Sequence, residues 1–375
     1  MKLKHLKQLN FKSLTDDKTV DKMSTIIDIK NHIIYQCDLF DDYKNLLTVD
    51  KSYHNLITAS ILFQEWKQIK NSKCTDNTLT VHKIFTYGCS MGLITFVKHL
   101  SHRYAWYNKS LEHAFMLCCK GNHIDLCQYL IEFNENRNCL MNIHINNDKI
   151  FKLCCEKNHI EIVKYVVMLG ENGYGKINTH NNMILMEAFI LSCQKGHINT
   201  VKYLITLGEN GYGRINIHYE YKGSSAFIQS CYNNHIDIAK YLIMLGENGY
   251  GKIDIHKQYD KVFRISCSKG YFDIVKYLIM LGENGYGKID IHYQYAKSFR
   301  ISCMNGNFHI VEYLIMLGEN GYGKIDIHSR YEHSYKSAFE LSLLIGHMKI
   351  SKYLIMLGEN GYGKIDIHYI ITIYS

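Results

Sequence analysis

The sequence predicts an all-α solenoid, a stack of helix pairs joined by long glycine-rich loops. A 16-residue stretch, YLIMLGENGYGKIDIH, occurs unchanged at residues 241–256, 277–292, 313–328 and 353–368. Its glycine-rich part begins at six positions that are 36 to 40 residues apart, namely Gly170, Gly208, Gly246, Gly282, Gly318 and Gly358. A period of this length is typical of a repeat architecture. The aliphatic residues before each copy recur at helical spacing, so the repeats are expected to be helical.

Each repeat is expected to contain two helices. In the repeat that begins after His256, the first helix is predicted over about 261–269, and Gly270 ends it. The second is predicted over 272–281, where the aliphatic residues return at the i, i+1, i+4, i+5 positions of one helical face. Gly282 then stands at the C-cap, where a left-handed glycine commonly closes a helix.

The repeats divide the chain into three parts. Residues 84–100 align without gaps on 262–278, so that about eight helix pairs are predicted over 81–368, with the first two the most degenerate. Residues 1–80 do not follow the repeat, and residues 369–375 form a short tail. A helical cap is expected over 1–80, because a solenoid must shield the apolar face of its terminal repeat.

The stretch GENGYGK contains the Gly-x-x-x-x-Gly-Lys skeleton of a phosphate-binding P-loop. In the copy that begins at Gly246, however, Ile253 stands where a P-loop needs Ser or Thr to bind magnesium. The stretch recurs six times, and a helix is predicted before it where a P-loop requires a strand. The sequence therefore favours a structural loop over a nucleotide site.

Cysteines form a column, one or two per repeat, in the predicted first helix. They are Cys154, Cys155, Cys193, Cys231, Cys267 and Cys303. No Cys-x-x-Cys pair exists in the chain. The pattern predicts small buried hydrophobic residues in a reducing compartment.

Histidines form two further columns. One follows the glycine-rich loop: His144, His180, His218, His256, His292, His328 and His368. The other occupies the turn between the helices: His123, His159, His197, His235 and His347. Equivalent atoms of stacked helices lie about 8 to 10 Å apart, whereas zinc ligands lie about 2.0 to 2.1 Å from the metal. We therefore predict no metal site and no cofactor, and expect the histidines to form hydrogen bonds that fix each connection to the next.

The segment AFILSCQKGHINTVKYLITLG (188–208) resembles an ankyrin repeat. The residues at matching places are Ala188, Phe189, Leu191, Ser192, Cys193, Gly196, His197, Val201, Leu204 and Gly208. The resemblance covers about 82–368, although the Thr-Pro-Leu-His tetrad is missing, the chain has no proline, and the loop is roughly four residues longer than usual. The long loop and the Ile/Lys/Asn/Tyr-rich composition resemble ankyrin proteins encoded by giant viruses of amoebae.

The resemblance implies that the chain binds a protein partner. In ankyrin proteins the segments that line the concave groove of the array make this contact. In this chain those segments follow each Ile-His and vary between repeats, whereas the second helix and its loop are copied almost unchanged. Tyrosines recur in them three residues after the histidine, at Tyr221, Tyr259, Tyr295 and Tyr331. Tyrosine supplies rigid contact area with a polar tip, and Arg264 and Arg300 are expected to add a small positive spot. The alternative is drift at exposed sites, with the tyrosines packing between hairpins.

Residues 23–67 are similar to an F-box, a helical motif that docks the adaptor of a cullin-based ubiquitin ligase. The residues that carry the similarity, and that would contact the adaptor, are Ile26, Ile27, Leu46, Leu47, Val49 and Trp66. The Leu-Pro expected at the start of an F-box is Met23-Ser24 here. A substrate receptor for a ubiquitin ligase is therefore an alternative function, and a simple cap is the alternative role for the segment.

Composition sets further expectations. The net charge of +8 accompanies no basic helix or zinc finger, so nucleic acid is not the expected partner. No run of 18 apolar residues exists, and the basic N-terminus lacks the apolar region of a secretory signal, although a mitochondrial presequence stays open. No unique group of catalytic side chains stands outside the repeat pattern. We expect a non-enzymatic, monomeric, cytoplasmic binding protein that is not secreted.

Overall fold

The computed structural model describes residues 81–366, apart from 105, 178–182 and 331–335. It confirms the all-α solenoid, because the described chain is built of helix pairs and contains one two-stranded hairpin. The chain divides into two compact units, one ending at Asn142 and the other beginning at Ile143. The expected helical cap over 1–80 and the tail over 369–375 lie outside the described residues.

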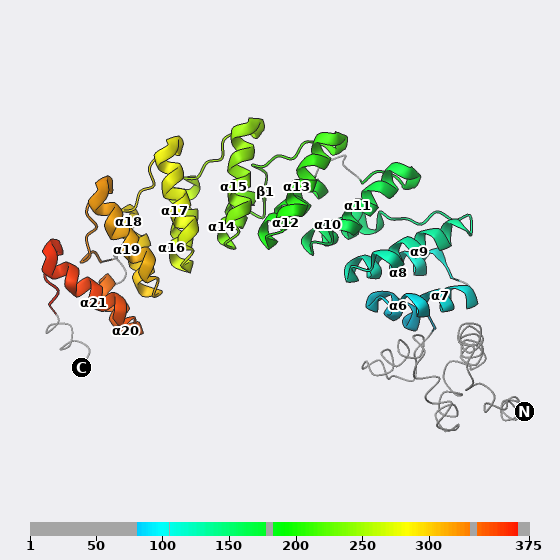
Figure 1. Ribbon diagram of the computed structural model, residues 1–375, viewed down its shortest axis with the longest axis horizontal. Coiled ribbons are helices and arrows are strands. Elements are labelled where there is room, and N and C mark those ends of the chain that lie inside the picture. The colour runs from blue at the N-terminus through cyan, green and yellow to red at the C-terminus, as the bar shows by residue number, and fades with distance from the viewer. Residues whose placement is uncertain (1–80, 105, 178–182, 331–335, 367–375) are drawn as a thin grey trace, which may run out of the picture. The chain divides into compact units, whose positions relative to one another are not determined.

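The first unit contains two helix pairs among its described residues (Figure 1). They are α6 (Val81–Met91) with α7 (Ile94–Arg103), and α8 (Asn108–Gly121) with α9 (Ile124–Glu135). Left-handed Asn122 (φ 64°) ends α8, as an asparagine C-cap can.

In the part of the second unit that the structure describes, six helix pairs stack in chain order (Figure 1). They are α10 (Ile145–Glu156) with α11 (Ile160–Leu169), α12 (Met183–Lys195) with α13 (Ile198–Leu207), α14 (Ala226–Tyr232) with α15 (Ile236–Leu245), α16 (Lys257–Lys269) with α17 (Phe272–Leu281), α18 (Tyr293–Met304) with α19 (Phe308–Leu317), and α20 (Ala338–Ile345) with α21 (Met348–Leu357). The hairpin of β1 (Glu220–Tyr221) and β2 (Ser224–Ser225) precedes α14.

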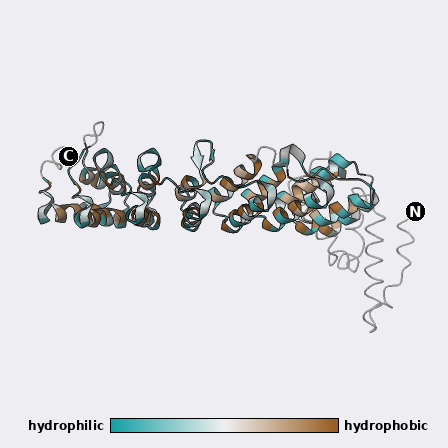
Figure 2. Cartoon of the chain, turned by 90° about the horizontal axis from the view of Figure 1, so that it is seen from above, coloured by the Kyte–Doolittle hydropathy of each residue, from teal (hydrophilic) through white to brown (hydrophobic). Residues whose placement is uncertain are grey.

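The core consists of columns in which each repeat contributes the same residue. Each first helix buries a phenylalanine: Phe85, Phe115, Phe151, Phe189, Phe227, Phe263, Phe299 and Phe339. One helical turn later, all but the last bury a cysteine, and the predicted column Cys154 to Cys303 is fully buried and free of disulfides. Burial raises the pKa of the Cys231 thiol to about 12, so these thiols are neutral core residues. Figure 2 shows the hydrophobic and hydrophilic residues alternating along the helices, as amphipathic packing requires.

The second helices end as predicted in position, though not in conformation. The predicted helix 272–281 is confirmed as α17. Gly282, expected to be left-handed, has right-handed φ and ψ of −57° and −41° and begins a one-turn π-helix, η5 (Gly282–Tyr286). A Cβ at Gly282 would lie 2.6 Å from the Gly287 carbonyl oxygen, so glycine is needed there because the backbone returns close to it. The left-handed residues are Gly285 and Gly287, at φ of 90° and 96°.

Equivalent π-turns follow the other second helices of this unit. They are η2 (Gly170–Tyr174), η3 (Gly208–Tyr212), η4 (Gly246–Tyr250), η6 (Gly318–Tyr322) and η7 (Gly358–Tyr362).

Candidate functional site

The glycine-rich connection that follows each second helix, residues 246–256 in one copy, is called the copied connection. It bonds each repeat of the second unit to the next. Nε2 of His256 donates to the Tyr286 carbonyl oxygen at 2.9 Å, across one repeat. The same bond recurs from His144, His218, His292 and His328. It confirms the prediction that these histidines fix the connections, while His180 and His368 lie outside the described residues. The sixth residue of GENGYG is glycine because the histidine stands against it: a Cβ on Gly287 would lie 2.9 Å from His256 Nε2.

Two more contacts run between the same connections. The Tyr286 hydroxyl donates to the Glu247 carboxylate of the preceding repeat at 3.0 Å. Lys252 of that repeat donates to the Gly285 carbonyl oxygen at 2.7 Å, and its Nζ lies 4.3 Å from the centroid of the Tyr286 ring. Equivalent tyrosine-to-glutamate bonds come from Tyr212, Tyr250, Tyr322 and Tyr362. The GENGYGK stretch therefore joins neighbouring repeats. Its basic residue, Lys252 in this copy, contacts the loop of the next repeat.

The histidines of the turns between helices also link neighbouring repeats. Nε2 of His197 donates to the Glu156 carbonyl oxygen at 2.9 Å, and His235 and His347 make the same contact with Gln194 and Met304. In the repeat that has Asn307 at this position, its amide donates to the Cys267 carbonyl oxygen at 2.8 Å. The copied residues thus explain the stack and leave the variable segments as the candidate site.

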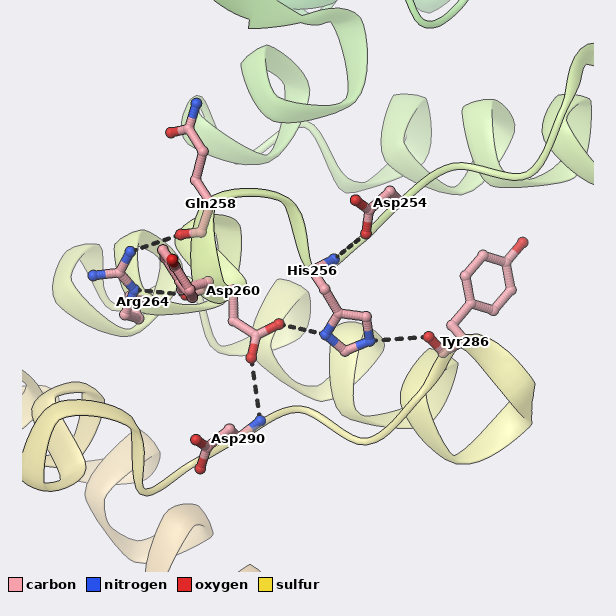
Figure 3. A network of polar contacts seen from close by, with 8 residues as sticks. Asp254, His256, Gln258, Asp260, Arg264, Tyr286 and Asp290 are labelled. Carbon is pink, nitrogen blue, oxygen red and sulfur yellow. Dashed lines mark hydrogen bonds and ion pairs between the residues drawn. The ribbon is translucent and has the colours of Figure 1, made fainter.

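The variable segment 257–264 begins with a left-handed turn, drawn in Figure 3. Gln258, Tyr259 and Asp260 have φ of 57°, 56° and 55° inside the first turn of α16. In α18 the equivalent residues Gln294, Tyr295 and Ala296 do the same, at 49°, 58° and 53°. Left-handed backbone costs a non-glycine residue roughly 1–2 kcal/mol, so consecutive residues of this kind need support from their surroundings.

An arginine five residues further along supports each left-handed turn. Nε of Arg264 donates to the Tyr259 carbonyl oxygen and its Nη2 to that of Gln258, both at 3.0 Å (Figure 3). Arg300 makes the same two bonds, to Tyr295 at 3.0 Å and to Gln294 at 3.1 Å. The planar guanidinium provides two parallel donors, a geometry that lysine cannot reproduce. The arginines therefore hold the shape of the two variable segments 257–264 and 293–300, which we call the tips.

A histidine and a carboxylate also stabilise the turn of α16 by hydrogen bonds. Asp260 is 6% exposed; its Oδ1 lies 2.5 Å from His256 Nδ1 and its Oδ2 accepts the Asp290 backbone N–H at 3.2 Å (Figure 3). Both ring nitrogens of His256 thus face oxygens, which suits the doubly protonated ring. Burial lowers the pKa of His256, but the bonds to Asp260 and the Tyr286 carbonyl outweigh it, and the net pKa is raised.

The left-handed turns bring two predicted tyrosines to the surface. Tyr259 is 73% exposed and Tyr295 is 54% exposed. The Tyr259 ring stacks on Tyr293 of the next repeat, with centroids 5.5 Å apart and an interplanar angle of 14°. The Arg264 guanidinium lies 5.0 Å from the centroid of the Tyr293 ring. Tyr293 was missed in the sequence because it has no tyrosine counterpart in the preceding repeat, where Lys257 stands.

The other predicted residues are placed differently. Arg300, expected to contribute to an exposed positive spot, is 5% exposed because its guanidinium turns inward to the carbonyls of its own tip. Tyr221 lies on strand β1 rather than in a left-handed turn, and Lys222 lies 5.2 Å from the centroid of its ring. The tyrosine column is therefore not one repeated structure. Tyr331 lies outside the described residues.

The adaptor-docking residues expected from the F-box similarity also lie outside the described residues. They are Ile26, Ile27, Leu46, Leu47, Val49 and Trp66.

The part of the chain that the structure describes holds neither a metal-binding cluster nor a membrane-spanning helix. Within it, no three His, Cys, Asp or Glu side chains gather as they would around a metal ion. Among the same residues, no helix combines the length and the apolar character that a membrane span requires.

A known family model matches part of the repeat region. Residues 153–259, from the middle of α10 to the left-handed turn of α16, match the family model described as ankyrin repeats (3 copies). This part of the chain is similar to ankyrin repeats. Proteins with ankyrin repeats generally mediate protein–protein interaction and are typically non-enzymatic. No curated protein matches the sequence. The buried Phe and Cys columns continue on both sides of the matched segment, so the helix pairs there have the same core.

Proposed function

We propose that the chain is a non-enzymatic scaffold that binds a partner protein through the variable tips of its ankyrin-like repeats. The observation that carries the proposal is the contrast between the two parts of a repeat. The copied connection is occupied by bonds to its neighbours, whereas the variable segments hold Tyr259 and Tyr295 outward at 73% and 54% exposure. Exposed tyrosines on a rigid support are typical of recognition surfaces.

From the resemblance to ankyrin proteins of giant amoebal viruses, the partner is proposed to be a host protein in the cytoplasm, bound by a monomer. The test places a photo-cross-linking amino acid at Tyr259 or at Tyr295 in the full chain and exposes it to amoebal lysate. Met280, 45% exposed on α17 in a copied helix, is the matched control position. Adducts should form from both tyrosine positions and not from Met280. Equal adducts from Met280, or none from the tyrosines, would contradict the proposal.

The F-box similarity supports a second proposal, that residues 1–80 deliver the bound protein to a ubiquitin ligase. The full chain would then co-purify with the ligase adaptor, and residues 81–375 would capture the same cargo without it. Capture of identical proteins by both forms, with no adaptor, would leave 1–80 as a cap.

A further inference from the structure

The tips of the repeats that start with α16 and α18 carry an excess of positive charge. Their segments, 257–264 and 293–300, contain five basic residues: Lys257, Lys261, Arg264, Lys297 and Arg300. The one acidic residue in them, Asp260, is buried against His256. Of the basic residues, Lys257 is paired with Glu220, and Arg300 is buried.

Three of these cations have no carboxylate against them within the described residues. Arg264 bonds only to neutral carbonyl oxygens, and Lys297 donates to the amide oxygen of Gln294 at 3.1 Å. Lys261 forms no ion pair there, and it occupies the position equivalent to Lys297. The two tips therefore present uncompensated positive charge beside exposed tyrosine rings.

The tips are also held in shape by contacts within the chain itself. Both left-handed turns are pinned by an arginine fork, and the Tyr259 ring rests on Tyr293. A group that is already ordered loses less conformational entropy when it binds. The strained backbone persists in two adjacent repeats, and strain of this kind is concentrated at functional positions.

We propose that these two tips form one binding site for an extended acidic segment of a partner protein. Its carboxylates would meet Lys261, Arg264 and Lys297, while its apolar side chains would lie on Tyr259 and Tyr295. The inference rests on the proposed function and adds the chemical class of the partner. Complementary charge gives such a contact its specificity and its speed of association.

A protein segment fits this surface better than a nucleic acid. The exposed carboxylates Asp254 and Asp290 lie on the connections that lead to the tips, where they accept the backbone N–H of His256 and His292. A continuous phosphate backbone would be repelled by them, and few cations are available to replace its counterions. An acidic protein segment, in contrast, can have its carboxylates next to the lysines and Arg264 and uncharged residues next to Asp254 and Asp290.

The test has two stages with the full chain. Random 12-residue peptides displayed on phage are first selected on the immobilised protein. Three fluorescent probes are then compared by anisotropy: a 12-residue peptide alternating Glu with Leu, the same peptide with Lys for Glu, and a 12-nucleotide oligouridylate. The selected peptides should be rich in Asp and Glu, and the Glu peptide should bind at least about tenfold more tightly than the other two probes, less so at high salt.

The decisive variant is Lys261→Glu with Lys297→Glu. Its matched control, Lys240→Glu with Lys276→Glu, makes the same change of charge at exposed positions on α15 and α17. The tip variant should weaken binding of the Glu peptide roughly tenfold or more, and the control should change it less than about twofold. Equal losses in both variants, or preferred binding of the oligouridylate, would overturn the inference. Binding of the selected peptides to a Tyr259→Ala variant separates the inference from the proposed function. If the selected peptides are not acidic but bind this variant more weakly, the inference is overturned and the proposed function is kept. If their binding to this variant is unchanged, both are overturned.

Discussion

At the scale of single residues, three glycines of each connection do three different things. Gly282 makes room for the Gly287 carbonyl oxygen, Gly285 supplies a left-handed backbone with open space beyond it, and Gly287 is left-handed and lies against His256. Repetition of the glycines is visible in the sequence. The reason why each position needs glycine cannot be seen in the sequence, because the returning loop and the histidine of the preceding repeat are known only from the structure.

The glycines give a first prediction. Gly282→Ala should lower the free energy of unfolding by about 1–3 kcal/mol, since its Cβ would meet a backbone oxygen at 2.6 Å. Gly285→Asn is the control, because asparagine accepts left-handed backbone and nothing lies within 4 Å of the added Cβ. Urea unfolding of both variants measures the difference. A control as unstable as Gly282→Ala would contradict this account.

The second prediction concerns pH and the pair of His256 and Asp260. The folded pKa of His256 is raised, so the stability from its protonation is complete below the ordinary histidine value of about 6.5 and is lost as the pH rises through the folded pKa. Asp260→Ala removes the carboxylate and copies Ala296, the residue of the next repeat. The wild type should exceed this variant in free energy of unfolding, measured with urea, by more at pH 6 than at pH 8. The two gaps should differ by at most about 1 kcal/mol. An equal gap at both pH values would count against the account.

At the scale of elements, the sequence predicted the regular parts and missed the strained ones. The bounds of α17 follow from aliphatic spacing and flanking turns, which are local signals. The left-handed turn could not be predicted, because Gln258, Tyr259 and Asp260 have ordinary side chains and the arginine that holds them follows only later in α16. Similarly, Tyr221 and Tyr259 occupy equal positions in the sequence but different structures, since Gly223 allows a hairpin before α14.

The arginine fork gives the third prediction. Arg264→Gln should speed amide hydrogen exchange at Tyr259 and Asp260, because it removes both donors to the left-handed carbonyls. The loss of unfolding free energy should be about 1.5–3 kcal/mol, the usual range for a hydrogen bond to a charged group. Lys276→Gln, an exposed cation on α17, is the control. Unchanged exchange at the tip would show that the turn does not depend on the fork.

At the scale of the whole molecule, each repeat of the second unit bonds to its neighbours through connections of nearly the same sequence. Residues 247–256 and 283–292 have the same sequence, so deletion of 257–292 would join His256 to Tyr293 as His292 is joined to it now. We predict that this shortened chain folds, with the same helical content per residue and a modest loss of melting temperature. Circular dichroism measures both, and deletion of 257–274, which breaks the register, is the control. Equal unfolding of both chains would contradict the modular account.

The central claim is that the connections hold the stack while the tips bind a partner. The measurement that tests it most directly compares lysate capture and melting temperature for Tyr259→Ala/Tyr295→Ala and for Tyr286→Phe/Tyr322→Phe. The account predicts that the tip variant loses capture and keeps its melting temperature, and that the connection variant melts earlier because it loses the bonds to Glu247 and Glu283. A tip variant that melts early, or that still captures its partners fully, would contradict the claim.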